Sequence, residues 1–112
     1  MARRRVYLAH EVPKGVVDMV RMICADYDRR ARELERGVLS DNVGCEYVRL
    51  NDAVESALES IDPNLRQDFL SDIGYRRGYD FAQVSPYLAK NTYYARKRKF
   101  IYDVAKSLFL VE

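Results

Sequence analysis

Apolar residues recur along the first third of the chain at the spacing of one helix face. From 12 to 37 they follow one another at intervals of three and four residues, which predicts a single α-helix. Pro13 suits the first turn of this helix, and Gly37 suits its end. The stripe is nearly heptad, so it fits packing inside the domain, which we favour, or the seam of a dimer. Its members are Val16, Val20, Ile23, Tyr27, Ala31 and Leu34.

Two further helices are predicted before residue 75. Turn residues fill 38–44, and the apolar pattern after them predicts a helix over about 46–60 with acids on its outer side. Asp62 and Pro63 predict the start of the next helix, because Asp is a good cap and Pro suits the first helical position. This third helix ends at the glycines of 74–78. Its inward residues are Leu65, Phe69, Leu70 and Ile73.

The segment from Asp80 onward carries two competing patterns. Asp80 and the glutamine three residues later have the form of a capping box, which predicts a fourth helix. Pro86 is awkward there, because proline lacks the N–H and clashes with the preceding helical turn. Either the fourth helix is short and the chain breaks near 89–91, or Pro86 starts one long helix and no helix-turn-helix exists. We favour the break, since Asn91 is a good N-cap.

The last predicted helix has an apolar face and a basic face. The apolar side, with its flanking rings, consists of Tyr93, Tyr94, Phe100, Ile101, Val104, Ala105 and Leu108. The outward side consists of Thr92, Ala95, Arg96, Lys99 and Asp103. The four consecutive bases at 96–99 fall in the first two predicted turns, where the helix dipole disfavours cations without an anionic partner.

Length and composition indicate one soluble all-α domain of about five helices. At 112 residues the chain is long enough for a real core, and its 48% apolar residues are typical of a globular protein. We expect a single domain over 1–112, with a helical part at 12–61 for packing or dimerisation and a helix-turn-helix part at 62–112. No apolar stretch reaches the length of a membrane span, so we expect no membrane partner and a cytoplasmic location.

Residues for catalysis or metal binding do not form any familiar pattern. Cys24, Cys45 and His10 are too few for a four-ligand zinc site, and we expect free thiols. The chain has no Ser/His/Asp set, no glycine-rich phosphate loop and no paired-carboxylate pattern. We therefore expect no enzyme activity, no metal and no cofactor.

Charge is distributed unevenly along the chain. Segment 40–75 holds eight acids against two arginines, whereas 90–106 holds six bases against one acid. A charge run is often only a solvated face, but a basic end on an acidic body indicates an anionic partner. Residues 3–5 are all arginine, and they form either an arm that reaches DNA or a solubilising tail.

Double-stranded DNA is the anionic partner that these residues favour. In a recognition helix the outward residues near the N-terminus contact bases and phosphates, so we assign base edges to Arg96 and Lys99. One of the two tyrosines at 93–94 is expected in the core. Phosphate contacts are assigned to Lys90, Lys97 and Arg98, and Asn91 and Thr92 lie at the helix start. The full candidate set is Arg76, Arg77, Lys90, Asn91, Thr92, Tyr93, Arg96, Lys97, Arg98 and Lys99.

The C-terminal half, from about Leu58 to Leu110, resembles the sigma-70 region-4-like domain of small phage regulators of the ArpU/RinA type. The motif T-Y-Y-x-R-[KR]-[KR]-[KR] is matched by 92–99, and Tyr75, Gly78 and Phe81 match the family pattern before it. The resemblance implies a phage or prophage activator of late or packaging-gene transcription with a C-terminal helix-turn-helix. The turn before residue 92 is about two residues shorter than in the family.

The sequence leaves other functions and partners open. One alternative is a DNA-packaging subunit of the small-terminase kind, which also carries a helix-turn-helix but assembles into a ring. Another is a helical module or inhibitor that binds an acidic protein through its basic face. For the regulator itself, a homodimer and a contact with host RNA polymerase are further partners to consider.

Overall fold

The structure is a computed structural model that describes residues 11–75 and 90–112. This part of the chain forms five α-helices and one short 3₁₀ helix, and it contains no strand. The elements are α2 (Lys14–Ala25), α3 (Tyr27–Arg36), α4 (Asp41–Leu58), η1 (Pro63–Leu65), α5 (Arg66–Tyr75) and α7 (Lys90–Ser107). The predicted all-α fold of about five helices is confirmed. The expected helix at Asp80 and the break at 89–91 fall at or beyond the edge of the described residues, so the helix-turn-helix stays a prediction.

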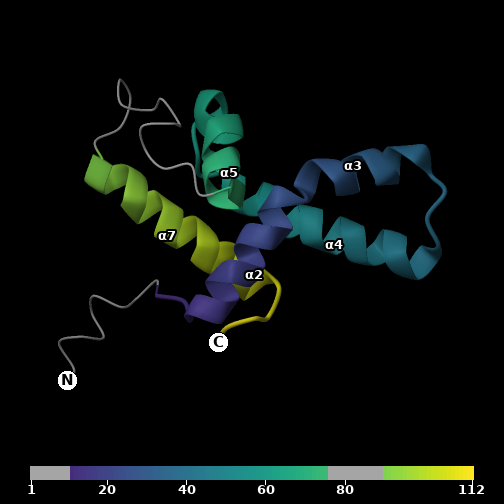
Figure 1. Cartoon of the computed structure of the whole chain (residues 1–112), viewed down its shortest axis with the longest axis horizontal. Helices are drawn as coiled ribbons and strands as arrows, with labels where there is room; N and C mark the ends of the chain where they lie inside the picture. The colour runs from purple at the N-terminus through teal and green to yellow at the C-terminus, as the bar shows by residue number, and fades with distance from the viewer. Residues whose placement is uncertain (1–10, 76–89) are drawn as a thin grey trace.

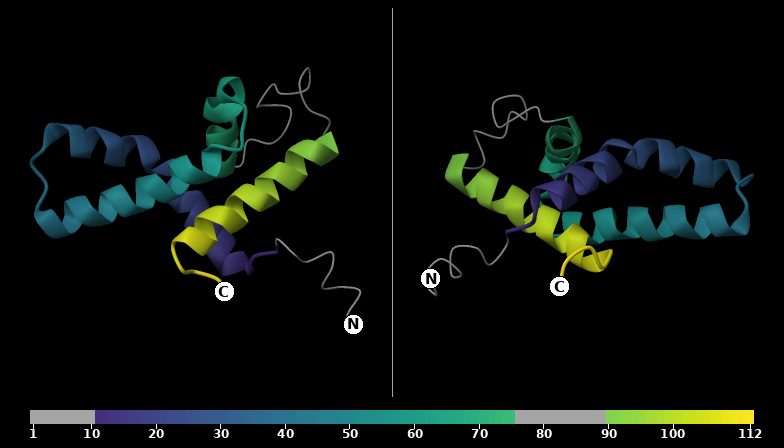
Figure 2. Two further views of the ribbon diagram at one scale, coloured as in Figure 1. Left: turned by 180° about the vertical axis from the view of Figure 1, so that it is seen from behind. Right: turned by 60° about the horizontal axis from the view of Figure 1, so that its bottom comes forward.

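Helices α2, α5 and α7 form the body of the molecule, and α3 and α4 leave it as an antiparallel hairpin (Figure 1). Both views in Figure 2 show this hairpin projecting away from α5 and from the first half of α7. The C-terminal half of α4 returns to the body and packs against α7. None of the described helices combines the length and the apolar character that crossing a membrane requires.

The core lies where α2, α4, α5 and α7 meet. Each contributes a fully buried residue: Val20 from α2, Val54 from α4, Ile73 from α5 and Val104 from α7. Phe69 of α5 packs edge-to-face against two rings of α7, with centroid distances of 5.6 Å to Tyr93 and 5.4 Å to Phe100. Of the stripe residues on α2, Val20 is fully buried in this core, and Val16 and Ile23 are partly buried against it. This part of the stripe packs inside the domain, and the dimer seam stays an alternative prediction.

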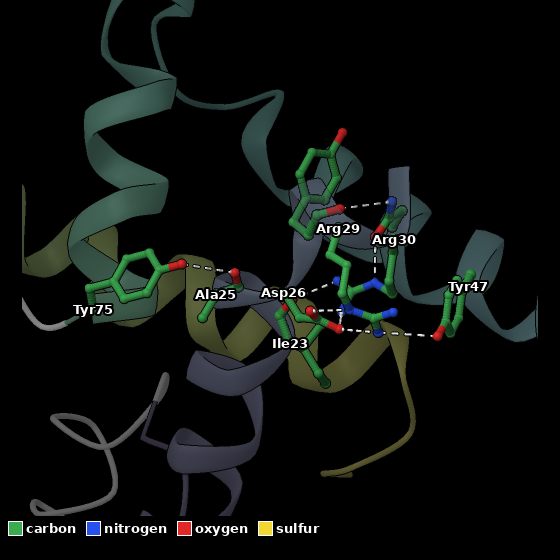
Figure 3. Close-up of polar contacts among 9 residues, drawn as sticks. Ile23, Ala25, Asp26, Arg29, Arg30, Tyr47 and Tyr75 are labelled. Carbon is green, nitrogen blue, oxygen red and sulfur yellow. Dashed lines mark hydrogen bonds and ion pairs between the residues drawn. The ribbon is translucent and has the colours of Figure 1, made fainter. Parts of the chain in front are cut away.

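The prediction of a single helix over 12–36 is wrong, because Asp26 interrupts the helix and separates α2 from α3. From α3, the Arg30 guanidinium donates a hydrogen bond to the Ile23 carbonyl of α2 at 2.6 Å (Figure 3). It also donates to the Asn51 side chain of α4 at 2.7 Å. Asp26 lies 3.6 Å from the same guanidinium. Arg30 is only 2% exposed, and a buried charge requires such partners. This polar contact joins α2, α3 and α4, and the apolar spacing alone did not reveal it.

The hairpin turn is decided by two local signals. Gly37 ends α3 with a φ of 69°, a left-handed conformation that glycine adopts at little cost, as predicted. The loop predicted over 38–44 is wrong from Asp41 onward, where α4 has already begun. Ser40 caps this helix, since its hydroxyl accepts a hydrogen bond from the Val43 amide at 3.5 Å. Ser40, which the sequence pattern placed among the turn residues of 38–44, is therefore the N-cap of α4.

The start of the third predicted helix is confirmed. The Asp62 carboxylate accepts a hydrogen bond from the Asn64 amide at 2.9 Å, and Pro63 opens η1 directly before α5. Helix α5 is described as far as Tyr75, within the predicted end at 74–78, and Gly74 lies in its last turn. A Cβ at this position would lie 2.9 Å from the Cα of Ala25, so glycine lets α5 approach the end of α2 closely.

Candidate nucleic-acid interface

Helix α7 is joined to α5 by a buried polar cluster, which we call the Asp72 cluster: Asp72, Tyr93 and Lys97. The Asp72 carboxylate is fully buried; it accepts a hydrogen bond from the Tyr93 hydroxyl at 2.5 Å and lies 2.9 Å from the Lys97 ammonium. The ammonium also lies 5.2 Å from the centre of the Tyr94 ring. Burial, and then the hydrogen bond to Asp72, raise the pKa of Tyr93. The cluster fixes which face of α7 turns toward the core.

The burial of Tyr93 and Lys97 argues against the DNA contacts predicted for these two residues. Tyr93 is fully buried and Lys97 is 8% exposed, so neither side chain is presented to a ligand. The helical spacing of Lys97 from the buried Phe100 and Val104 indicates the reason. Positions three, four and seven apart share a helix face, and this face is apolar. That spacing was the available signal, but the run of four bases hid it. Asp72, the partner of both residues, enters the sequence analysis only as one of the eight acids of segment 40–75.

The remaining described candidates lie on the outward face of α7. The exposed ones are Asn91, Thr92, Arg96, Arg98 and Lys99. Lys90 is the first residue of α7, and Asn91 therefore lies inside the helix rather than capping it. Arg76 and Arg77 are outside the described residues, as is the arginine run at 3–5.

The earlier start of α7 also changes the electrostatic argument. The bases at 96–99 occupy the seventh to tenth positions of α7, whereas the helix dipole acts mainly on the first turn. The dipole therefore gives no reason to place an anion beside them. A different observation does: Arg96 and Arg98 make no ion pair within the described part of the chain, whereas Lys99 lies 2.7 Å from Asp103.

Most other described arginines are satisfied by the protein itself. Arg29, Arg36 and Arg49 pair with acids on or beside their own helices at 2.6 to 3.1 Å. Arg21 and Arg66 donate to backbone carbonyls. The first ten residues of α7 contain no acid, and the exposed Arg96 and Arg98 give this surface a positive charge that no acid of the described chain pairs with. Such a surface can bind an anionic partner.

No known protein family, curated protein or solved structure matches this chain. The resemblance to ArpU/RinA-type regulators therefore stays a prediction.

Proposed function

We propose that this chain binds double-stranded DNA through the outward face of α7 and regulates transcription, as the resemblance to phage ArpU/RinA-type regulators implies. The observation that carries the proposal is the pair Arg96 and Arg98, which are exposed on a helix segment without acids and unpaired among the described residues. Exposed, unpaired arginines can neutralise the phosphates of the DNA backbone. This neutralisation releases counterions and supplies most of the affinity of a protein for DNA.

The shape of the surface favours DNA over an RNA duplex. An α-helix with its side chains is about 10–12 Å wide and enters the major groove of B-form DNA, which is about 12 Å wide. The major groove of an A-form RNA duplex is too deep and narrow to be read in this way. The Asp72 cluster supports the same proposal, because it holds α7 rigidly while its outer face stays exposed.

The test begins with selection of bound duplexes from a random-sequence DNA library. A selected duplex and its scrambled form are then titrated by fluorescence anisotropy over a range of salt concentrations. We expect several-fold preference for the selected duplex and affinity that falls steeply with salt. The double variant Arg96→Gln/Arg98→Gln should lower the salt slope by about 2, because each phosphate contact contributes about 0.9.

The matched control is Arg32→Gln/Arg36→Gln, which removes the same charge from the exposed side of α3. It should leave both affinity and salt slope nearly unchanged. Equal losses for the two double variants would refute an interface on α7. Absence of DNA binding would instead favour an acidic protein partner, and a ring of many subunits on sedimentation would favour the packaging function.

A further inference from the structure

The buried residues of α7 determine which residues lie at the centre of its outward face and which lie on the two flanks of that face. Successive residues of an α-helix are turned by about 100°, so each position on α7 has a defined direction. The residues that face the core are Tyr93, Lys97, Phe100, Ile101, Val104, Ala105 and Leu108. Directly opposite this buried arc lie Ala95 and Lys99. Thr92 and Asn91 lie about 40–60° to either side of the same outward direction.

Arg96 and Arg98 do not share a side of this face. They are two residues apart, and on an α-helix this separation turns them about 160° from one another. Each lies about 80° from the outward direction, one on either flank of α7. Both are exposed, and neither pairs with an acid in the described chain. When a helix lies in the major groove with its outward face toward the base edges, each of its flanks faces one of the two sugar-phosphate strands.

We propose that Arg96 and Arg98 contact phosphates on opposite strands of the duplex, while Ala95 makes the closest approach to the groove floor and Lys99 and Thr92 face the base edges. This inference rests on the proposed function and changes one assignment made from sequence, because Arg96 moves from the bases to the backbone. Lys99 can reach a base because its present partner, Asp103, forms only an exposed pair. Such pairs contribute little stability and are readily exchanged.

The small side chain at position 95 has a specific consequence under this geometry. A larger residue there would keep α7 away from the groove floor. Ala95 is exposed, and Ala95→Leu keeps a strong helix former. We expect an unchanged melting temperature and an affinity for the selected duplex at least about tenfold weaker. The matched control is Ser56→Leu, an exposed position on α4, which should bind normally.

The strand assignment is tested with methylphosphonate linkages, which remove the phosphate charge from one strand of the selected duplex at a time. On the unmodified duplex, Arg96→Gln should bind more weakly than the unsubstituted protein. When the strand that Arg96 contacts carries the methylphosphonates, the affinity of the unsubstituted protein should fall, but the affinity of Arg96→Gln should change little, because that contact is already lost. Arg98→Gln should show the same coupling with the other strand only. Circular dichroism confirms that each variant is folded.

Coupling of both arginines to the same strand, or of neither to any strand, would overturn the assignment while leaving DNA binding intact. Normal binding by Ala95→Leu would likewise overturn the close approach at Ala95. If the unsubstituted protein binds no duplex, the proposed function itself is wrong and the strand assignment is wrong with it.

Discussion

Replacing Lys97 with methionine separates its structural role from the DNA contact expected from sequence. Lys97→Met keeps the long apolar stem but removes the ammonium that lies 2.9 Å from the buried Asp72 carboxylate. Breaking a buried pair in this way costs about 3–5 kcal/mol, and we expect the lower end, because Tyr93 still donates to Asp72. With a denaturant slope of about 2 kcal/mol per molar urea, the unfolding midpoint should fall by about 1.5 M.

Urea unfolding followed by circular dichroism measures this shift. The matched control is Lys99→Met, which breaks only the exposed pair with Asp103 and should cost about 0.5 kcal/mol or less. The double variant Asp72→Asn/Lys97→Met removes both charges of this pair, so much of the lost stability should return. A Lys97→Met midpoint within error of the unsubstituted protein, together with a lower salt slope for DNA binding, would refute the structural role.

Three further predictions follow from buried groups. Gly74→Ala should destabilise the fold by about 1–3 kcal/mol in the same urea assay, because its Cβ meets the α2 backbone; no change would mean that α5 can shift. In native protein a thiol reagent should modify the exposed Cys45 rapidly and the buried Cys24 only on unfolding, since burial raises the pKa of Cys24 to about 12; equal rates would contradict this. Burial and Glu55 raise the pKa of Tyr27 to about 12, and the pKa of Tyr93 is also raised. Above pH 10 the unfolded state loses tyrosine protons that the folded state keeps. The free energy of unfolding should therefore stay constant with respect to these tyrosines below pH 10 and fall as pH rises above it. A free energy of unfolding that does not change from pH 9 to 12 would contradict this.

Local signals in the sequence predicted some helix boundaries correctly, at Gly37 and at Asp62–Pro63, but the cap at Ser40 was missed. The Asp62–Pro63 pair and Gly37 act through their own side chain or conformation, so no distant contact is needed to interpret them. The break at Asp26 was missed for the opposite reason. It is stabilised by Arg30 and Asn51, which are 21 residues apart, and no periodicity within α2 or α3 encodes that contact.

The candidate interface was predicted only in part. Its exposed members, among them Arg96 and Lys99, followed from helical spacing and charge. The sequence alone thus determined an all-α fold and a basic segment near the C-terminus, since periodicity and composition are properties of the chain itself. The tertiary structure decided that Lys97 faces the core. Lys97 is buried because Asp72, 25 residues earlier, lies opposite it in the core, and a charge pairs with what folding brings near it.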